Sequence, residues 1–98
     1  MPRIEIYTRA PCPYCTLAMR LLEARGLAYE HIDLRREPER TEEMLRRAGG
    51  RRTVPEIFIG GELVGGYEEL LALDRQGGLV ALAQEAQGPA GGSGKQKE

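Results

Sequence analysis

The sequence is poor in the residues that build metal sites and disulfide cross-links. Its 98 residues contain two cysteines, one histidine, one phenylalanine and no tryptophan. Because a structural zinc site needs four ligands, chiefly cysteine and histidine, one chain cannot complete such a site and we expect no metal. Cys12 and Cys15 stand only three positions apart, so a disulfide between them closes a loop too small to restrict the unfolded chain much. A purely structural cross-link is therefore disfavoured.

Long apolar segments and an excess of charge are missing too. No run approaches the roughly 18 apolar residues of a membrane span, and residues 1–11 lack the apolar core of a secretion signal. The 14 Lys and Arg residues nearly balance the 15 Asp and Glu residues, which argues against a dedicated nucleic-acid binder. A local basic cluster is expected to form a solvated face: Arg46, Arg47, Arg51 and Arg52. We therefore expect a cytoplasmic monomer with neither nucleic acid nor a membrane as partner.

Alternating apolar patterns predict a series of strands and helices. Residues 2–8 alternate Ile4 and Ile6 with charged residues, as a half-buried strand does. The helical segment that follows the cysteines stops at Gly26, and we expect its apolar face to comprise Tyr14, Leu17, Ala18, Leu21 and Leu22. Further along, the pattern predicts a strand over 27–35, a helix over 37–49, a hairpin over 54–65 turning at Gly60 and Gly61, and helices over 67–76 and 77–87.

This order of elements predicts an α/β fold. A strand, a helix and a second strand make one right-handed parallel crossover, whereas the hairpin adds two antiparallel strands. The expected architecture is a four-stranded mixed sheet flanked by helices on both faces, within one domain spanning residues 1–87. Residues 88–98 carry no apolar side chain larger than alanine and are predicted to form a disordered tail.

The two cysteines lie where the first strand passes into the first helix. A Cys-x-x-Cys pair in this position indicates redox chemistry, because the helix N-terminus offers unpaired N–H groups and positive potential to a thiolate. Cys12, at the start of the helix, is expected to be the exposed nucleophile. Cys15, within the first turn, is expected to be shielded and to resolve mixed disulfides. Pro13 suits the first helical position, where an N–H has no partner within the helix.

The helix alone cannot provide a strongly acidic thiol. Lowering the pKa of a thiol by three units takes about 4 kcal/mol, whereas a helix terminus contributes at most about 2 kcal/mol. Direct hydrogen bonds from backbone N–H groups, with Arg9 nearby, are therefore expected to supply much of the remainder. A stable thiolate helps most as a leaving group, so we predict turnover through a mixed disulfide on Cys12.

Three motifs in order resemble those of one family. The sequence "CPYC" is followed by "TVPEIF" at residues 53–58 and by "GGYEEL" at residues 65–70. Over residues 3–86 the chain resembles a glutaredoxin of the short bacterial dithiol type. The resemblance implies a thioredoxin-like fold and an enzyme that uses glutathione as co-substrate. Such an enzyme reduces protein disulfides, for instance in ribonucleotide reductase, and glutathione mixed disulfides.

The resemblance also implies how glutathione is bound. Thr53, Val54 and Pro55 would form a loop with a cis proline facing the cysteines, and the Val54 backbone would hold the extended tripeptide as an added strand. Gly66 would open a helix whose Tyr67 and Glu68 N–H groups bind the γ-glutamyl carboxylate, and the Glu68 side chain would approach its amino group. The glycyl carboxylate would pair with two cations, Arg9 and Arg51, and Tyr14 would flank the sulfur with its ring.

Two other functions remain open from the sequence. One is a glutaredoxin-like electron donor that thioredoxin reductase reduces and that serves ribonucleotide reductase. The other is an iron–sulfur cluster carrier, in which two chains share the cluster and another thiol supplies missing ligands. His31 is interpreted as a strand surface residue, because no second catalytic partner for it is visible.

Overall fold

The computed structural model describes residues 3–87, in which strands and helices alternate as expected. The elements are β1 (Ile4–Thr8), α1 (Pro13–Ala24), β2 (Glu30–Asp33), the short 3₁₀ helix η1 (Pro38–Arg40), α2 (Thr41–Arg47), β3 (Glu56–Ile59), β4 (Glu62–Gly65), α3 (Tyr67–Arg75) and α4 (Gly78–Gln87). The tail predicted over 88–98 lies outside the described residues. No helix in the described part is both long and apolar enough to cross a membrane.

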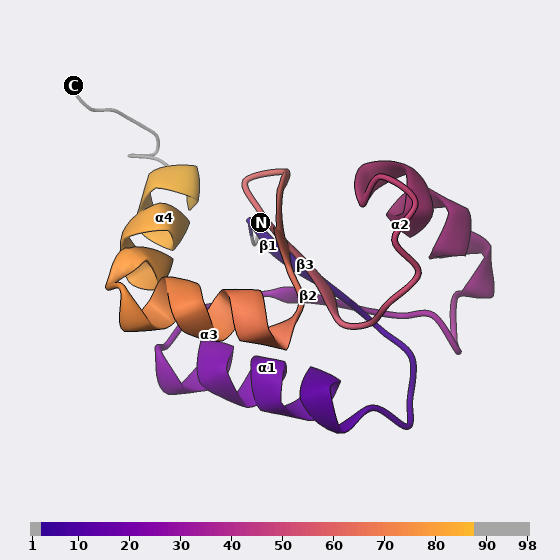
Figure 1. The fold of residues 1–98 in the computed structure, drawn as a ribbon, viewed down its shortest axis with the longest axis horizontal. Coiled ribbons are helices and arrows are strands. Elements are labelled where there is room, and N and C mark those ends of the chain that lie inside the picture. The colour runs from indigo at the N-terminus through magenta and orange to yellow at the C-terminus, as the bar shows by residue number, and fades with distance from the viewer. Residues whose placement is uncertain (1–2, 88–98) are drawn as a thin grey trace.

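The four strands form one mixed sheet in the order β2-β1-β3-β4 (Figure 1). β1 runs parallel to β2 and antiparallel to β3, and β3 runs antiparallel to β4. The hairpin turns at Gly60 and Gly61, whose φ angles of 61° and 85° are the positive values that a type I′ turn requires at both central positions. The predicted mixed sheet and its crossover are confirmed.

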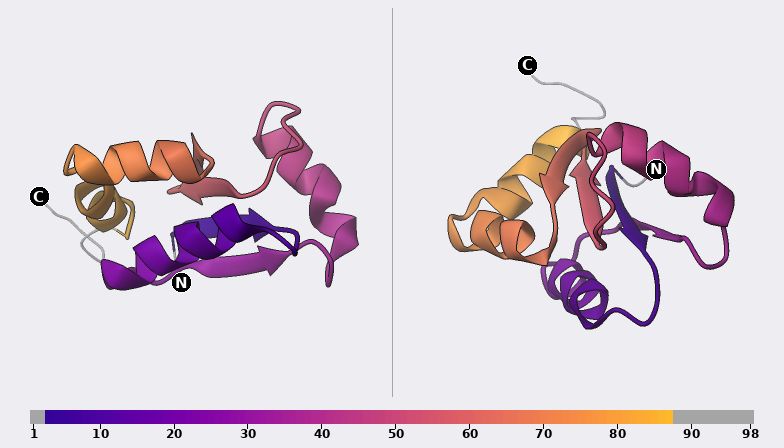
Figure 2. Two further views of the ribbon diagram at one scale, coloured as in Figure 1. Left: turned by 60° about the horizontal axis from the view of Figure 1, so that its bottom comes forward. Right: turned by 45° about the vertical axis from the view of Figure 1, so that its right-hand side comes forward.

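Helices cover both faces of the sheet (Figure 2). On one face α1, α3 and α4 enclose the larger core, which comprises Ile4, Ile6, Ala18, Leu22, Ile57, Ile59, Leu70, Leu79 and Ala83. On the other face α2 covers a smaller core of Tyr7, Ile32, Leu34, Met44, Ala48 and Phe58. Because side chains alternate across a strand, β1 and β3 contribute to both cores and are buried on both sides.

The expected apolar face of α1 is wrong at its N-terminal end. Tyr14 and Leu17 are 57% and 40% exposed, whereas the buried residues of the helix are Cys15, Ala18 and Leu22. The first turn of α1 extends past the core, so apolar side chains at helical spacing there face solvent. Hydrophobic spacing alone does not reveal where the covering layer ends.

The basic cluster is only partly a solvated face. Arg46, Arg51 and Arg52 are exposed as expected, but Arg47 is half-buried beneath α2. Its two terminal nitrogens donate to the Glu5 carboxylate at 2.7 and 3.1 Å, and its guanidinium lies 4.2 Å from the centroid of the Phe58 ring. Arg47 was expected to be solvated as part of a basic cluster, but it pairs with a strand carboxylate on the covered face of the sheet.

Tyr7 joins the same polar group at the base of α2. Its hydroxyl donates to Glu43 and accepts a hydrogen bond of 2.8 Å from Arg47. Burial, followed by the hydrogen bond to Glu43, raises the pKa of Tyr7 to about 12. These contacts attach α2 to β1 on the face opposite α1.

Two leucines on α1 provide a direct test of the corrected helix face. Leu22 is fully buried and Leu17 is 40% exposed. We expect Leu22→Ala to lower the free energy of unfolding by about 2–5 kcal/mol, because it removes core contacts and leaves a cavity. Leu17→Ala is expected to change it by about 0.5 kcal/mol or less. Urea denaturation of both variants measures the difference, and equal losses would contradict the assignment of the faces.

The C-terminal end of α1 is attached to α3 by one ion pair. Arg25 donates from Nε and Nη2 to the two Asp74 carboxylate oxygens, each at 2.8 Å. This hydrogen bonding lowers the pKa of Asp74 below its ordinary value of 3.8. The bidentate geometry fixes the direction of α1 relative to α3.

The Arg25–Asp74 pair predicts a pH-dependent contribution to stability. Because the Asp74 pKa is lower in the folded protein, the pair stabilises the fold above pH 3.8, and this contribution is lost as pH falls through the folded-state pKa. Asp74→Asn is expected to destabilise the protein at neutral pH, and to do so less at an acidic pH below 3.8. Unfolding measured at both pH values, with Glu62→Gln as an exposed control, tests this. A pH-independent difference would contradict it.

Candidate redox site

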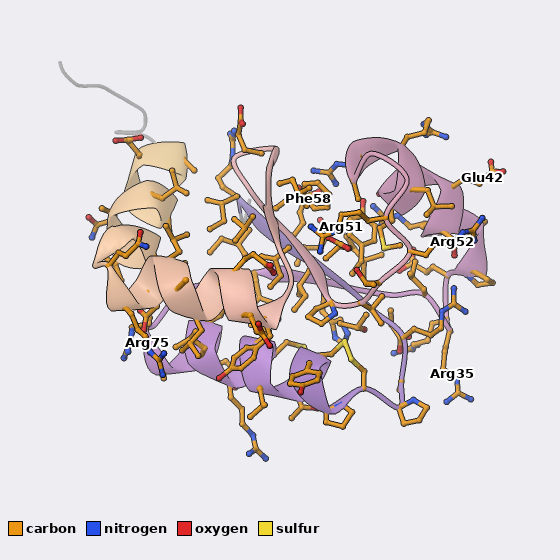
Figure 3. All side chains as sticks on the ribbon, viewed as in Figure 1. Arg35, Glu42, Arg51, Arg52, Phe58 and Arg75 are labelled. Atoms are coloured by element: carbon orange, nitrogen blue, oxygen red, sulfur yellow. A yellow bond between two sulfur atoms is a disulfide. The ribbon has the colours of Figure 1, made fainter. Side chains whose placement is uncertain are left out.

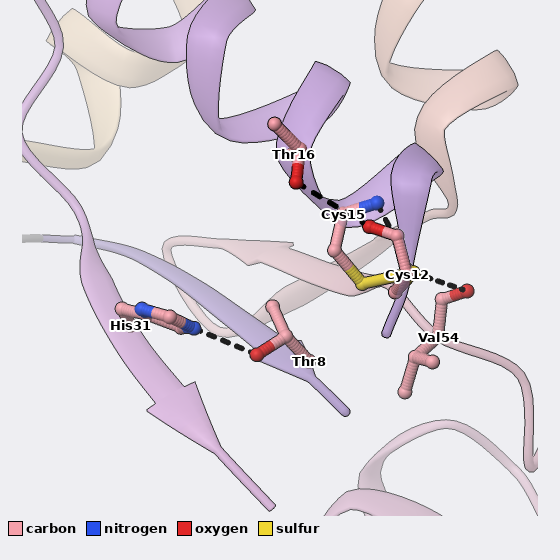
Figure 4. The surroundings of a disulfide bond; sticks show 6 residues. All are labelled: Thr8, Cys12, Cys15, Thr16, His31 and Val54. Atoms are coloured by element: carbon pink, nitrogen blue, oxygen red, sulfur yellow. Dashed lines mark hydrogen bonds between the residues drawn. A yellow bond between two sulfur atoms is a disulfide. The ribbon is translucent and has the colours of Figure 1, made fainter. Parts of the chain in front are cut away.

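The site lies at the C-terminal end of β1, where the chain turns into α1. The turn contains a cis peptide between Ala10 and Pro11, and Cys12 and Cys15 are joined by a disulfide. Figure 4 shows this disulfide between the Val54 carbonyl on one side and the Thr8–His31 pair on the other. The carboxyl end of a strand beside a helix N-terminus is where α/β sheets commonly carry their sites.

Cys12 caps the helix with its sulfur. Its backbone is extended, with φ −153° and ψ 95°, and Pro13 takes the first helical position as predicted. The N–H of Cys15 donates to the Cys12 Sγ at 3.1 Å, and the N–H of Thr16 donates to the Cys12 carbonyl at 3.2 Å. The direct N–H contact to sulfur expected from the sequence is therefore present. A helix N–H in this position is the kind of donor that favours a thiolate over a thiol.

The two sulfurs differ in accessibility. Cys12 is half-buried, whereas Cys15, within the first turn of α1, is only 2% exposed. An incoming thiol or disulfide therefore reaches Cys12 first. The order of exposure is the expected one, with a more accessible first cysteine and a shielded second one, and the catalytic roles of the two cysteines stay predictions.

The loop before β3 faces Cys12. The peptide between Val54 and Pro55 is cis, as the resemblance implied, and the Val54 carbonyl oxygen lies 3.8 Å from the Cys12 Sγ. Pro55 is buried and Val54 is half-buried. The backbone of this loop is thus close enough to the sulfur to align a peptide that carries the reacting thiol.

A cavity of about 240 Å³ opens between this loop and α3. Eight residues predicted for glutathione binding line it: Tyr14, Arg51, Thr53, Val54, Pro55, Gly66, Tyr67 and Glu68. Tyr14 and Tyr67 form one wall, with their rings stacked 26° from parallel and their centroids 6.2 Å apart. The structure therefore gathers residues from three separate segments of the chain around one opening.

Arg9, the ninth predicted residue, is not part of this lining. It is exposed, and its Nη2 donates to the Thr41 hydroxyl at 3.3 Å. Its place in the binding site stays a prediction. Arg51 and Arg52 stand on the loop between α2 and β3, and both side chains are exposed (Figure 3).

Two acidic residues at the site were missed in the sequence. Glu69 lines the cavity, and its Oε1 accepts the Gly66 N–H at 2.8 Å, so that N–H is already occupied. The spacing of Glu69 three residues after the helix cap is a capping-box signal and would have revealed it. Glu56 lies fully buried at the start of β3, and no sequence pattern distinguishes it from an outward-facing strand residue.

A second, smaller cavity of about 100 Å³ adjoins the cysteines on the side of β2. His31 is exposed, as interpreted from the sequence, and its Nε2 lies 2.7 Å from the Thr8 hydroxyl oxygen at the edge of this cavity. Within residues 3–87, no three His, Cys, Asp or Glu side chains gather as metal ligands.

An accessible sulfur that accepts a helix N–H, with a second sulfur shielded beside it, can exchange disulfides with other molecules. Together with the βαβ–ββα sheet, this pair defines the class: the protein is a thiol–disulfide oxidoreductase with a thioredoxin-like fold. Residues 4–64 match the family model described as Glutaredoxin. The chain belongs to the glutaredoxin family.

Curated relatives match most of the chain. Glutaredoxin 3 of Escherichia coli strain K12 is 43% identical over 82 residues, which cover 84% of this chain and 98% of the relative. A glutaredoxin of Pseudomonas aeruginosa is 46% identical over 82 residues, covering 84% of this chain and 96% of that protein.

Solved structures agree with the sequence relatives. The solution structure of a glutaredoxin from Brucella melitensis has a TM-score of 0.74 at 42% identity, covering 89% of this chain and 94% of that one. The crystal structure of a buckwheat glutaredoxin–glutathione complex has a TM-score of 0.78 at 30% identity, covering 86% of this chain and 78% of that one. The thioredoxin-like fold is thereby established.

The unequal exposure of the sulfurs predicts selective alkylation. After reduction, iodoacetamide is expected to modify Cys12 at least about tenfold faster than Cys15, because Cys12 is accessible and accepts a helix N–H. Peptide mass spectrometry at short reaction times measures the two rates. Cys12→Ser is the matched control and should leave only slow labelling of Cys15. Preferential labelling of Cys15 in the intact dithiol would contradict the assigned roles.

Proposed function

We propose that this chain uses glutathione to reduce protein disulfides and glutathione mixed disulfides. The observation that carries the proposal is the cavity of about 240 Å³, because its lining combines a helix start at Gly66, one cation, Arg51, and a peptide-like edge at Val54. These are the groups that an extended peptide with a carboxylate at each end requires. The Val54 carbonyl oxygen also lies 3.8 Å from the Cys12 Sγ, which links the cavity to the reactive sulfur. The buckwheat relative, whose crystal structure is titled as a complex with glutathione, supports the same assignment.

The proposed cycle uses both cysteines for protein disulfides. The Cys12 thiolate attacks a substrate sulfur, the substrate disulfide breaks, and the other substrate sulfur leaves as a thiolate that takes up a proton. Cys15 then loses its proton and attacks the Cys12 sulfur, which releases the reduced substrate and forms the Cys12–Cys15 disulfide. Two glutathione molecules restore the dithiol and leave as glutathione disulfide. A glutathione mixed disulfide needs Cys12 alone, because a second glutathione can release it.

A reducing compartment such as the cytoplasm suits this cycle, because glutathione there is kept largely reduced. Ribonucleotide reductase is one candidate protein substrate, and we propose that the chain acts as a monomer.

The rival function, an electron donor that thioredoxin reductase reduces, needs no cavity for a tripeptide. A coupled assay decides: turnover with glutathione and glutathione reductase supports the proposal, whereas turnover with thioredoxin reductase alone contradicts it. Absorbance of the freshly purified protein between about 300 and 450 nm tests the iron–sulfur carrier.

Arg51 provides a test of how the glycyl carboxylate is bound. We expect Arg51→Gln to raise the KM for glutathione about three- to tenfold, with a smaller change in kcat, because an uncharged amide loses the ion pair. Steady-state kinetics with a glutathione mixed disulfide provides the measurement. Arg46→Gln makes the same charge change on the exposed side of α2 and should leave KM unaltered. Equal effects of the two variants would remove Arg51 from the site.

A further inference from the structure

Glu56 is a buried carboxylate directly beneath the proposed glutathione site. It begins β3, immediately after the cis proline, and it is 0% exposed. Its Oε2 accepts a hydrogen bond of 2.7 Å from the Thr53 hydroxyl and lies 3.4 Å from the Arg51 Nε. Its Oε1 has no hydrogen-bond partner within the described part of the chain. A fully buried glutamate is uncommon unless it is paired, so its partners matter.

Both partners of Glu56 line the cavity, and Arg51 carries the only positive charge in that lining. The other charged lining residues, Glu68 and Glu69, are acidic. Arg51 presents its Nε edge to Glu56, while its side chain remains 46% exposed. The same guanidinium therefore faces an internal carboxylate and the position proposed for the carboxylate of glutathione.

We propose that Glu56 is a positioning residue that sets the affinity for glutathione, by holding Arg51 from beneath and weakening its attraction for the glycyl carboxylate. This inference rests on the proposed function, in which Arg51 binds that group. Two carboxylates that share one cation repel each other, and a buried charge is poorly screened by salt. Glu56 thus raises the KM for glutathione and hastens its release.

The charge of Glu56 can be separated from its positioning role. A glutamine retains an oxygen that can accept the Thr53 hydrogen bond on the side that faces Arg51, and it has nearly the same volume. Glu56→Gln therefore removes the competing charge while leaving the loop held in place. An alanine would remove both effects at once and would not distinguish them.

Steady-state kinetics with two thiols tests the proposal. For Glu56→Gln we expect the KM for glutathione to fall about two- to fivefold, with kcat changing less. With γ-glutamylcysteine, which lacks the glycyl carboxylate, KM should be the same in the variant and the parent protein. Glu62→Gln, an equal change of charge at an exposed position on β4, should alter neither KM.

A KM for glutathione that is unchanged or higher in Glu56→Gln would overturn the proposal, as would an equal fall with γ-glutamylcysteine. In an Arg51→Gln background, Glu56→Gln should have no further effect. An undiminished effect there would also overturn it. If Glu56→Gln does not fold, Glu56→Asp, whose shorter side chain withdraws the carboxylate from Arg51, should lower the KM for glutathione by a smaller factor. Arg51→Gln alone tests the proposed function. If this variant does not raise the KM for glutathione, Arg51 does not bind the glycyl carboxylate. If Arg51→Gln raises KM but Glu56→Gln leaves it unchanged, only the proposed role of Glu56 is lost.

Discussion

The hydrogen bond from the Cys15 N–H to the Cys12 sulfur is the contact on which the site depends, because it places the reactive atom at the positive end of α1. That contact exists only while α1 begins at Pro13 and keeps its direction. α1 is held in this position by the packing of Ala18 and Leu22 against the sheet and by the ion pair from Arg25 to Asp74. The larger core therefore serves the chemistry by fixing where one helix starts.

Most of the fold and the cysteine chemistry could be predicted because they depend on local patterns. Each of these patterns can be recognised from a few neighbouring residues: the alternation at Ile4 and Ile6, the glycine turn of the hairpin, and Pro13 at the first helical position. The predictions failed where the burial of a side chain depends on residues that are distant in the sequence. Arg47 is half-buried because Glu5, 42 residues away in the sequence, accepts its hydrogen bonds. Tyr14 is exposed because the covering layer ends before it, which no helical periodicity can show.

The candidate site likewise has residues that local motifs predicted and residues that they did not. The motifs contain seven of the eight predicted residues that line one cavity, since each motif has its own backbone geometry at a turn or a helix start, and Arg51 precedes the second motif. The two acidic residues that were missed differ in this respect: Glu69, in the cavity lining, has capping-box spacing, whereas Glu56, beneath the cavity, has no such local signal. Glu56 alternates like any strand residue, and only the tertiary structure shows that its carboxylate contacts Thr53 and Arg51 from inside. Charges that modify a site from below are consequently harder to predict than groups that contact a ligand.

The burial of Cys15 determines which molecules its sulfur can react with. A sulfur that is only 2% exposed collides rarely with dissolved thiols, peroxides or metal ions, but it is permanently adjacent to whatever is bonded to Cys12. In the proposed cycle its attack on a mixed disulfide at Cys12 is therefore an intramolecular, first-order step that does not depend on the concentration of dissolved thiols. Oxidative damage beyond the disulfide, to sulfinic or sulfonic acid, should accordingly accumulate on the outer sulfur and spare the inner one.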